Sequence, residues 1–249
     1  MTHVELFGQP IVSSSLDGSL LGTEVLFRVG ADGRSGVIPP QSYLSAMAGS
    51  QMAWFLDATV MGILMVGDTR GISERLFINV CPETLMLPYA FNAWLAGVAE
   101  LCQRRGPGQV VVEIPEHIPY TPRMIALVRA IAAKGALLAL DDYPGGSLDS
   151  RYLHAYQWDY VKVCRTACAN AGRDLPTVVQ EIRRYCPGAQ IIGERYSPAH
   201  VELGSVAHQI AGLQSFETGM PAPLQISERS FEPRSQAFAC GATPLLAVV

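Results

Sequence analysis

The sequence has few of the features that mark specialised protein classes. It has six cysteines but no Cys-x-x-Cys pair, which argues against a zinc framework and favours reduced thiols. Lysine and arginine total 18 against 22 aspartates and glutamates, and without a basic excess we expect no binding to duplex nucleic acid. The start lacks the basic and apolar regions of a signal peptide. The longest apolar stretch, 52–66, is interrupted by Asp57 and is too short for a membrane span. We therefore expect a cytoplasmic protein.

Apolar, strand-like runs alternate with helical segments along most of the chain. The 249 residues are 49% hydrophobic, which is ample for a large core. Alternation of strands and helices predicts parallel strands joined by crossover helices. About eight strands predict an α/β fold of the TIM-barrel type, with an open doubly wound sheet as the alternative. The expected strands are 8–12, 22–28, 76–80, 109–113, 136–141, 160–163, 190–194 and 209–214.

The helical segments are expected between these strands, and several begin with proline, which suits the first helical turn. Beyond about residue 225, proline, serine, glycine and charged residues mix without periodicity. We therefore predict one domain over 1–225, followed by a tail at 226–249 that is either irregular or the start of a further region. The expected helices are 40–48, 51–66, 82–104, 121–134, 150–157, 175–185 and 198–205.

Two adjacent carboxylates, Asp141 and Asp142, close the apolar run 136–140. Charges at the end of a buried strand are costly unless something pairs them. A divalent cation suits this role because hard cations bind several carboxylate oxygens. The alternative is a strand that ends at a polar turn, since Tyr143-Pro144-Gly145-Gly146 follows and such residues favour turns.

Polar side chains recur at the ends of the other predicted strands. In an α/β barrel the active site lies at the carboxyl ends of the strands, so these side chains are expected to meet at one mouth. Carboxylates with an amide and a lysine suit a site for two hard cations, bridged by one aspartate. Each residue taken alone also fits a cap, a turn or a surface charge. The set comprises Glu24, Asn79, Glu113, Lys162, Glu194 and Gln214.

Several short motifs appear in a fixed order. Glu24-Val25-Leu26, Glu113-Ile114-Pro115-Glu116 and Asp141-Asp142-Tyr143 are the most specific, and they resemble the EAL-domain family of bacterial cyclic-di-GMP phosphodiesterases. The resemblance covers roughly 8–224. The supporting segments are Gln9-Pro10-Ile11-Val12, Phe77-Ile78-Asn79-Val80, Tyr160-Val161-Lys162-Val163, Gln214-Ser215-Phe216 and Met220-Pro221, with Arg28 after the first motif and Glu194 after the last aspartates.

The resemblance implies a modified TIM barrel with one antiparallel strand, and hydrolysis of cyclic-di-GMP to linear pGpG with two Mg²⁺ or Mn²⁺ ions. It implies that Lys162 orients the attacking water or offsets developing charge, and that Lys162, Glu24 and Glu194 are the catalytic residues. It also implies cyclic-di-GMP as ligand, and a homodimer or a regulatory protein as further partners. The implied ligands are Glu24, Asn79, Glu113 and Asp141 for the first ion, and Asp141, Asp142 and Glu194 for the second. The other implied roles are Arg28 for a phosphate, Gln214 for the nucleotide pocket and Glu116 as anchor of the loop after Asp142.

The chain departs from the family pattern at several positions, which leaves two hypotheses open. One is a metal-dependent phosphodiesterase whose activity is weak or lost, supported by the retained ligands and Lys162. The other is a catalytically inactive EAL-like receptor or protein-interaction regulator, supported by the changes. An unrelated, enolase-like metal-dependent barrel is a third alternative, against which the serial motifs argue. The changes are Val25 for alanine, Cys164 for aspartate, Pro144-Gly145-Gly146 in the loop, Arg195-Tyr196-Ser197 for Gly-Val-Glu, and Ser215 for glycine.

Overall fold

The computed structural model describes most of the chain. The expected helix at 40–48, the loop residues Gly145 and Gly146, and the segment 229–249 lie outside the described part. The described residues are 2–15, 18–31, 37–38, 53–69, 71–72, 74–116, 118–119, 121–144 and 151–228.

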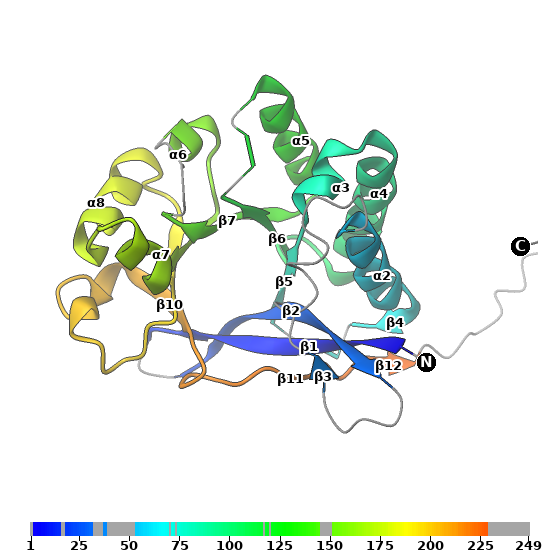
Figure 1. Cartoon of the computed structure of the whole chain (residues 1–249), viewed down its shortest axis with the longest axis horizontal. Helices are drawn as coiled ribbons and strands as arrows, with labels where there is room; N and C mark the ends of the chain where they lie inside the picture. Colours follow the sequence, from blue (N-terminus) through cyan, green and yellow to red (C-terminus); the bar gives the residue numbers. More distant parts are fainter. Residues whose placement is uncertain are drawn as a thin grey trace, which may run out of the picture.

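Eight strands form a closed ring (Figure 1). Seven of them run parallel, and β1 (Thr2–Ser13) pairs antiparallel with both β2 (Leu20–Ala31) and β10 (Ile210–Gln214). These two pairings close the sheet, which excludes the open doubly wound alternative. The expected modified TIM barrel with one antiparallel strand is confirmed. The other five strands are β5 (Arg75–Asn79), β6 (Val110–Pro115), β7 (Leu137–Tyr143), β8 (Tyr160–Cys164) and β9 (Gln190–Glu194).

The inside of the ring is filled by a layer of apolar side chains. The ring of Phe77 meets that of Tyr160 edge to face, with centroids 5.1 Å apart. Because side chains alternate along a strand, the neighbouring residues face outward and pack against the helices in a second core. A filled interior leaves only the open end of the ring for a site. The inner layer consists of Ile11, Phe77, Val111, Ala139, Tyr160 and Ile192.

Helices cover the ring on the side of β5 to β9, whereas β1 and β2 form its other wall (Figure 1). No helix in the described residues is long and apolar enough to cross a membrane. The helices are α2 (Ala53–Val66), α3 (Pro82–Met86), α4 (Pro88–Arg105), α5 (Pro122–Ala132), α6 (Arg151–Ala155), α7 (Arg165–Asn170) and α8 (Leu175–Tyr185).

Two helix predictions were wrong. The expected helix 82–104 is two helices, α3 and α4, separated at Leu87, which has an extended backbone. Pro88 explains the break, since a proline lacks the amide donor and disfavours the helical conformation at the residue before it. The expected helix 198–205 contains only the 3₁₀ turn η1 (Val201–Leu203). The 3₁₀ turn is followed directly by Gly204, and glycine disfavours continuation of a helix.

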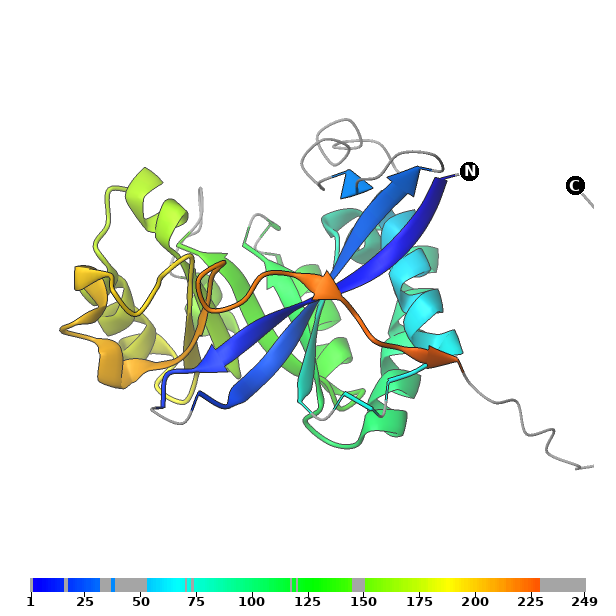
Figure 2. The same ribbon diagram turned by 90° about the horizontal axis from the view of Figure 1, so that it is seen from below.

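The segment after the ring runs along the outside of the β1–β2 hairpin (Figure 2). β11 (Ala222–Pro223) pairs with β1, and β12 (Ser227–Glu228) pairs with β4 (Gly67–Asp68). The Leu224 N–H donates to the Leu6 carbonyl at 2.8 Å. Ordered pairing thus continues to Glu228, three residues past the expected boundary at 225. The short strand β3 (Val37–Ile38) extends the sheet beyond β2.

Candidate functional site

A polar side chain stands two residues after each inner-layer residue on the parallel strands. Val111 is followed by Glu113, and Tyr160 by Lys162. Residues i and i+2 of a strand point to the same face, so each polar group sits one step above the apolar layer, at the mouth of the ring. The same step places Asn79 above Phe77, Asp141 above Ala139, Glu194 above Ile192, Glu24 above Gly22 and Gln214 above Gly212.

Both aspartates face this mouth because β7 carries a bulge. Leu140 pairs with Val161 and Tyr143 with Val163, so Asp141 and Asp142 together oppose Lys162. A bulge of this kind leaves one residue unpaired and redirects the side chains beside it. Asp142 accordingly adopts a φ of 51°. The bulge brings two carboxylates to the mouth where a regular strand would present one.

Lys162 lies at the centre of the mouth and is 1% exposed. Burial alone would lower its pKa, but the surrounding carboxylates outweigh burial and raise the pKa well above its usual value. The ammonium is therefore charged. It forms ion pairs with Glu113 at 2.6 Å, Glu194 at 2.9 Å, Asp141 at 3.0 Å and Glu24 at 3.4 Å.

Glu24 is the most strongly stabilised anion of the cluster. Burial raises its pKa, but Lys162 and hydrogen bonds from two amides outweigh burial and lower the pKa below its usual value. The Asn79 amide donates to Oε1 at 2.8 Å, and the Gln214 amide donates to Oε2 at 2.5 Å. The two amides therefore hold the Glu24 carboxylate in one orientation.

Glu113 is the least satisfied carboxylate. It is fully buried, and apart from the ion pair with Lys162 neither oxygen has a hydrogen-bond partner. Burial and the charge of Glu24 raise its pKa well above the usual value. Burial with the charges of Asp141 and Asp142 similarly raises the pKa of Glu194 to about 8, although Lys162 opposes this shift. Four carboxylates share the single positive charge of Lys162, so a bound cation would offset the remaining negative charge of the cluster.

The donor set fits hard divalent cations. Glu24, Asn79 and Glu113 come together around Lys162 with Asp141, as predicted for a first ion, and they offer carboxylate and amide oxygens. Oε2 of buried Glu113 has neither a hydrogen bond nor an ion pair, and a bound cation would satisfy it. The residues predicted for a second ion lie on the adjoining strands β7 and β9.

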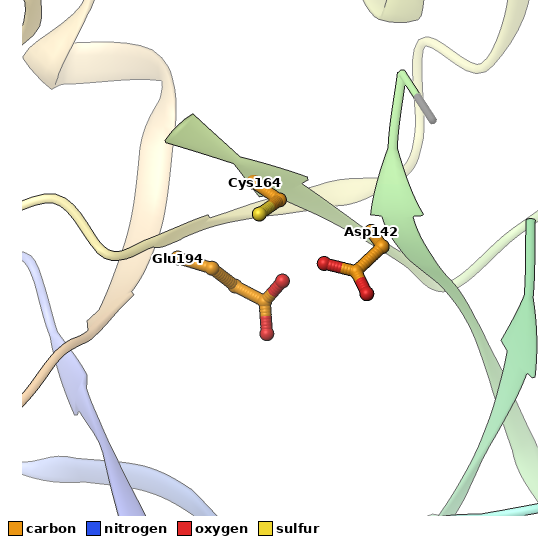
Figure 3. A group of neighbouring side chains, drawn as sticks. All are labelled: Asp142, Cys164 and Glu194. Carbon is orange, nitrogen blue, oxygen red and sulfur yellow. The ribbon is translucent and has the colours of Figure 1, made fainter. Parts of the chain in front are cut away.

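One side chain beside this second group was not predicted as a donor. The ligand atoms of Asp142, Cys164 and Glu194 all lie within 4.8 Å of one another. Figure 3 shows the three side chains pointing into one space from three strands. Burial, followed by the charge of Asp142, raises the pKa of the Cys164 thiol to about 11. A sequence signal was present: Cys164 stands two residues after Lys162 and therefore shares its face.

Two other predicted residues, Glu116 and Arg28, lie outside the Lys162 cluster. Glu116 is half-buried, and burial with the charges of Asp142 and Asp141 raises its pKa to about 7. It lines a cavity of about 340 Å³ together with Asp142, Cys164 and Arg195. Arg28 donates to the Phe27 carbonyl at 2.9 Å and lies over the Phe7 ring at 5.7 Å. Within the described part of the chain, Arg28 does not contact the carboxylates around Lys162.

Further departures follow the strands β9 and β7. Ser197 is 2% exposed, and its backbone N–H donates to Nδ1 of His200 at 2.7 Å. Arg195 has a φ of 60°, and its backbone N–H donates to the Gln214 carbonyl at 2.7 Å. The Tyr143–Pro144 peptide bond is cis.

The fold is similar to those of several solved EAL structures. The FimX EAL domain from Pseudomonas aeruginosa, bound to c-di-GMP, matches with a TM-score of 0.69 at 17% identity over 88% of this chain and 90% of that one. The PaMucR phosphodiesterase in a c-di-GMP complex matches with a TM-score of 0.70 at 17% identity, over 88% and 92% of the two chains. The EAL enzyme Bd1971, in its cAMP and cyclic-di-GMP bound form, matches with a TM-score of 0.73 at 18% identity, over 88% and 62%.

The sequence is also similar to a characterised protein. The cyclic di-GMP phosphodiesterase PdeL of Escherichia coli (strain K12) is 24% identical over 246 residues, which cover 88% of this chain and 63% of PdeL. The chain thus matches less than two thirds of that relative's length. The model of the EAL domain family matches residues 2–191, which include Glu24, Glu113 and Lys162. Glu194 and Gln214 lie beyond that match, and the structure alone brings them to the mouth. The match spans well over half of the sequence, and the chain belongs to the EAL domain family.

Proposed function

We propose that this chain binds cyclic-di-GMP at the mouth of the ring with two divalent cations, Mg²⁺ or Mn²⁺, and hydrolyses one phosphodiester bond to give linear pGpG. The observation that carries the proposal is the buried Lys162, surrounded by Glu24, Glu113, Asp141 and Glu194. Buried clusters of a lysine and several carboxylates, such as this one with its unsatisfied Glu113, are typical of catalytic and ion-binding sites.

The cyclic-di-GMP part is supported by the relatives. PdeL is named a cyclic di-GMP phosphodiesterase, and the PaMucR and FimX structures contain c-di-GMP. Each is less than 25% identical to this chain, so the ligand is proposed by analogy and the site residues supply the independent support.

The cations would be held by two groups of oxygen donors. When bound, they would lower the pKa of a water and stabilise charge on the phosphoryl oxygens. Asp141 would belong to both groups, which is supported by its sharing Lys162 with Glu113 and with Glu194. The first group is Glu24, Asn79, Glu113 and Asp141, and the second is Asp141, Asp142 and Glu194.

The chain's own residues would orient the reactants. Lys162 is fixed by its carboxylate partners and would hold the attacking water or donate to a phosphoryl oxygen. Gln214 already orients Glu24, and its own Oε1 is buried without a partner, so it would accept a hydrogen bond from a guanine edge. Arg28 would bind a phosphate, for which its planar fork is suited. Glu116 would anchor the loop after Asp142.

The test is a hydrolysis assay and a binding assay on the same preparation. With Mg²⁺ or Mn²⁺ the protein should convert cyclic-di-GMP to pGpG, and Glu24→Gln should abolish conversion because it removes an ionised ligand. Glu100→Gln is the matched control, since Glu100 is exposed on α4 and pairs with Arg104 one turn away.

A second candidate function is a receptor that binds cyclic-di-GMP without turnover, or a regulator that binds a protein partner. It is favoured by Cys164 and buried Ser197, which stand where the resemblance places carboxylates. Binding measured by calorimetry without any pGpG would contradict the phosphodiesterase and support the receptor. Absence of binding with either metal would contradict both and leave a regulatory protein partner. A homodimer remains a separate proposal, to be checked by light scattering.

A further inference from the structure

We propose that Cys164 is a metal ligand, and that Asp142, Cys164 and Glu194 form a subsite that prefers Zn²⁺ to Mg²⁺. Cys164 would thus be a donor in its own right, where the family pattern alone suggests a lost carboxylate. The inference rests on the proposed function only in sharing its second cation subsite, because it requires neither nucleotide nor turnover.

The geometry of the three donors is already close to that of a bound ion. All three ligand atoms lie within 4.8 Å of one another. Donors around a tetrahedral Zn²⁺ are separated by about 3.5 Å, given bond lengths of about 2.0–2.3 Å. Small side-chain rotations close that difference. The backbone is fixed by the sheet, since Cys164 pairs directly with Glu194 across β8 and β9.

A second observation links this subsite to a buried carboxylate through Lys162. Glu113 is completely buried, and its Oε2 has neither a hydrogen bond nor an ion pair. Its Oε1 contacts the same Lys162 ammonium, at 2.6 Å, that lies 2.9 Å from Oε1 of Glu194. The single lysine is thus shared between an unsatisfied carboxylate and a member of the proposed subsite. A cation at Glu194 would reduce the number of carboxylates that depend on Lys162, which contacts Glu113 most closely.

The subsite is also reachable. Cys164 is 4% exposed, yet it lines the cavity of about 340 Å³ that Asp142, Glu116 and Arg195 also line. With three protein donors, a bound Zn²⁺ would keep a fourth position for a water or a phosphate oxygen, as in zinc sites that bind a substrate.

The preference for Zn²⁺ follows from the sulfur. Mg²⁺ binds oxygen ligands in octahedral geometry, whereas Zn²⁺ accepts thiolate and carboxylate in the same tetrahedral site. On binding, the S–H bond of Cys164 is replaced by an S–Zn bond, and the proton passes to the solvent. No oxidant or further reactant is needed.

The test uses Co²⁺ as a spectroscopic probe on the full, nucleotide-free chain. The native protein should show a near-ultraviolet thiolate-to-cobalt charge-transfer band that Zn²⁺ displaces and Mg²⁺ does not. Cys164→Ser should lose the band and at least about tenfold in Zn²⁺ affinity. Cys168→Ser, at a buried cysteine on α7, should keep both. Cys164→Asp should lack the band and bind Mg²⁺ more tightly than the native chain.

Three results would overturn the proposal: Co²⁺ binding without the band, a band that persists in Cys164→Ser, or no binding of Co²⁺ or Zn²⁺ by the native chain. If Cys164→Ser fails to fold, zinc K-edge X-ray absorption of the native protein provides the test. The proposal predicts one sulfur neighbour at about 2.3 Å from the zinc. Oxygen neighbours alone would contradict the proposal. Failure of cyclic-di-GMP binding would leave these metal readouts untouched, so the two proposals fail separately.

Discussion

Lys162 is the residue whose removal should affect stability and metal response together. It is one of two lysines in the chain, and it pairs with four buried or half-buried carboxylates. Lys162→Met should lower the free energy of unfolding by about 3–5 kcal/mol at neutral pH without metal, because it leaves the buried Glu24 carboxylate without its counter-charge. Divalent cations should restore part of that loss in thermal unfolding experiments.

The control for this prediction is Lys134→Met, at the only other lysine. Lys134 is exposed in the turn after α5, so its substitution should change stability by no more than about 0.5 kcal/mol and should not respond to metal. Equal losses in the two variants would contradict the role assigned to the Lys162 cluster.

The sequence located most of the site because its residues end apolar strands. The structure brings Glu24, Asn79, Glu113, Asp141, Lys162, Glu194 and Gln214 to one mouth. The bulge that turns both aspartates inward was not predictable, because it depends on how β7 pairs with β8. Cys164 was interpreted by comparison with a motif, whereas its donor role depends on a strand register.

At the scale of elements, Asp57 links α2 to the start of α3. The N-cap residue of α3 is Cys81, whose side chain makes no capping bond, and Asp57 instead accepts from the Cys81 N–H at 2.7 Å and from the Thr84 hydroxyl at 2.5 Å. Burial, opposed by these hydrogen bonds, raises the Asp57 pKa from 3.8 to about 6. The folded state therefore keeps this proton at pH values where the unfolded chain has lost it.

This raised pKa predicts a pH dependence of stability. Between about pH 4 and pH 6 the folded state binds more protons than the unfolded state at this group, so its contribution falls as pH rises. Relative to Asp57→Asn, the native chain should lose about 2–3 kcal/mol across this interval, as measured by urea unfolding at several pH values. A constant difference would contradict it. Asp174 caps α8 and has a lowered pKa, so Asp174→Asn should give the opposite slope.

Tyr143, at the end of β7, forms a side-chain hydrogen bond with α8. Its hydroxyl donates to Glu181 at 2.8 Å, and Arg173 contacts the same carboxylate at 2.5 Å. Tyr143→Phe should cost about 1 kcal/mol, since one buried hydrogen bond is lost. Because Tyr143 follows Asp142 directly, metal affinity should fall as well. Tyr89→Phe, at an exposed ring, should change neither thermal stability nor metal affinity.

Helices and strands were predictable from the sequence where the apolar pattern is long and regular. They were less predictable where a proline interrupts that pattern or where the element is short. The parallel strands β5 to β9 were expected within about two residues because they are continuous apolar runs. The break at Leu87 was missed although Pro88 marks it, because the apolar pattern continues through it. The short helix α7 was not expected, since six residues give too little periodicity.

At the scale of the whole molecule, the segment after the ring should contribute to stability. Half-buried Leu224 and Ile226 pack against the main core, and β11 pairs with β1. A chain ending at Pro221 should be less stable by about 2–3 kcal/mol than one ending at Glu228, because that apolar contact is lost. Chemical unfolding of the two shortened chains compares them directly. Equal midpoints would show that the segment is dispensable for the fold.

Glu24 and Gln214 bond across 190 positions of sequence, from the first hairpin to the last strand of the ring. They meet only where β1 joins β2 to β10, which is the seam of the barrel. A cation or nucleotide bound at this seam would stabilise the closed ring, because its ligands come together only when the ring is closed. At a hundredfold excess over its dissociation constant, such a ligand adds about 2.7 kcal/mol to the cost of opening the barrel. A ligand that binds there as proposed would therefore lower the population of the opened ring and slow proteolysis that requires opening.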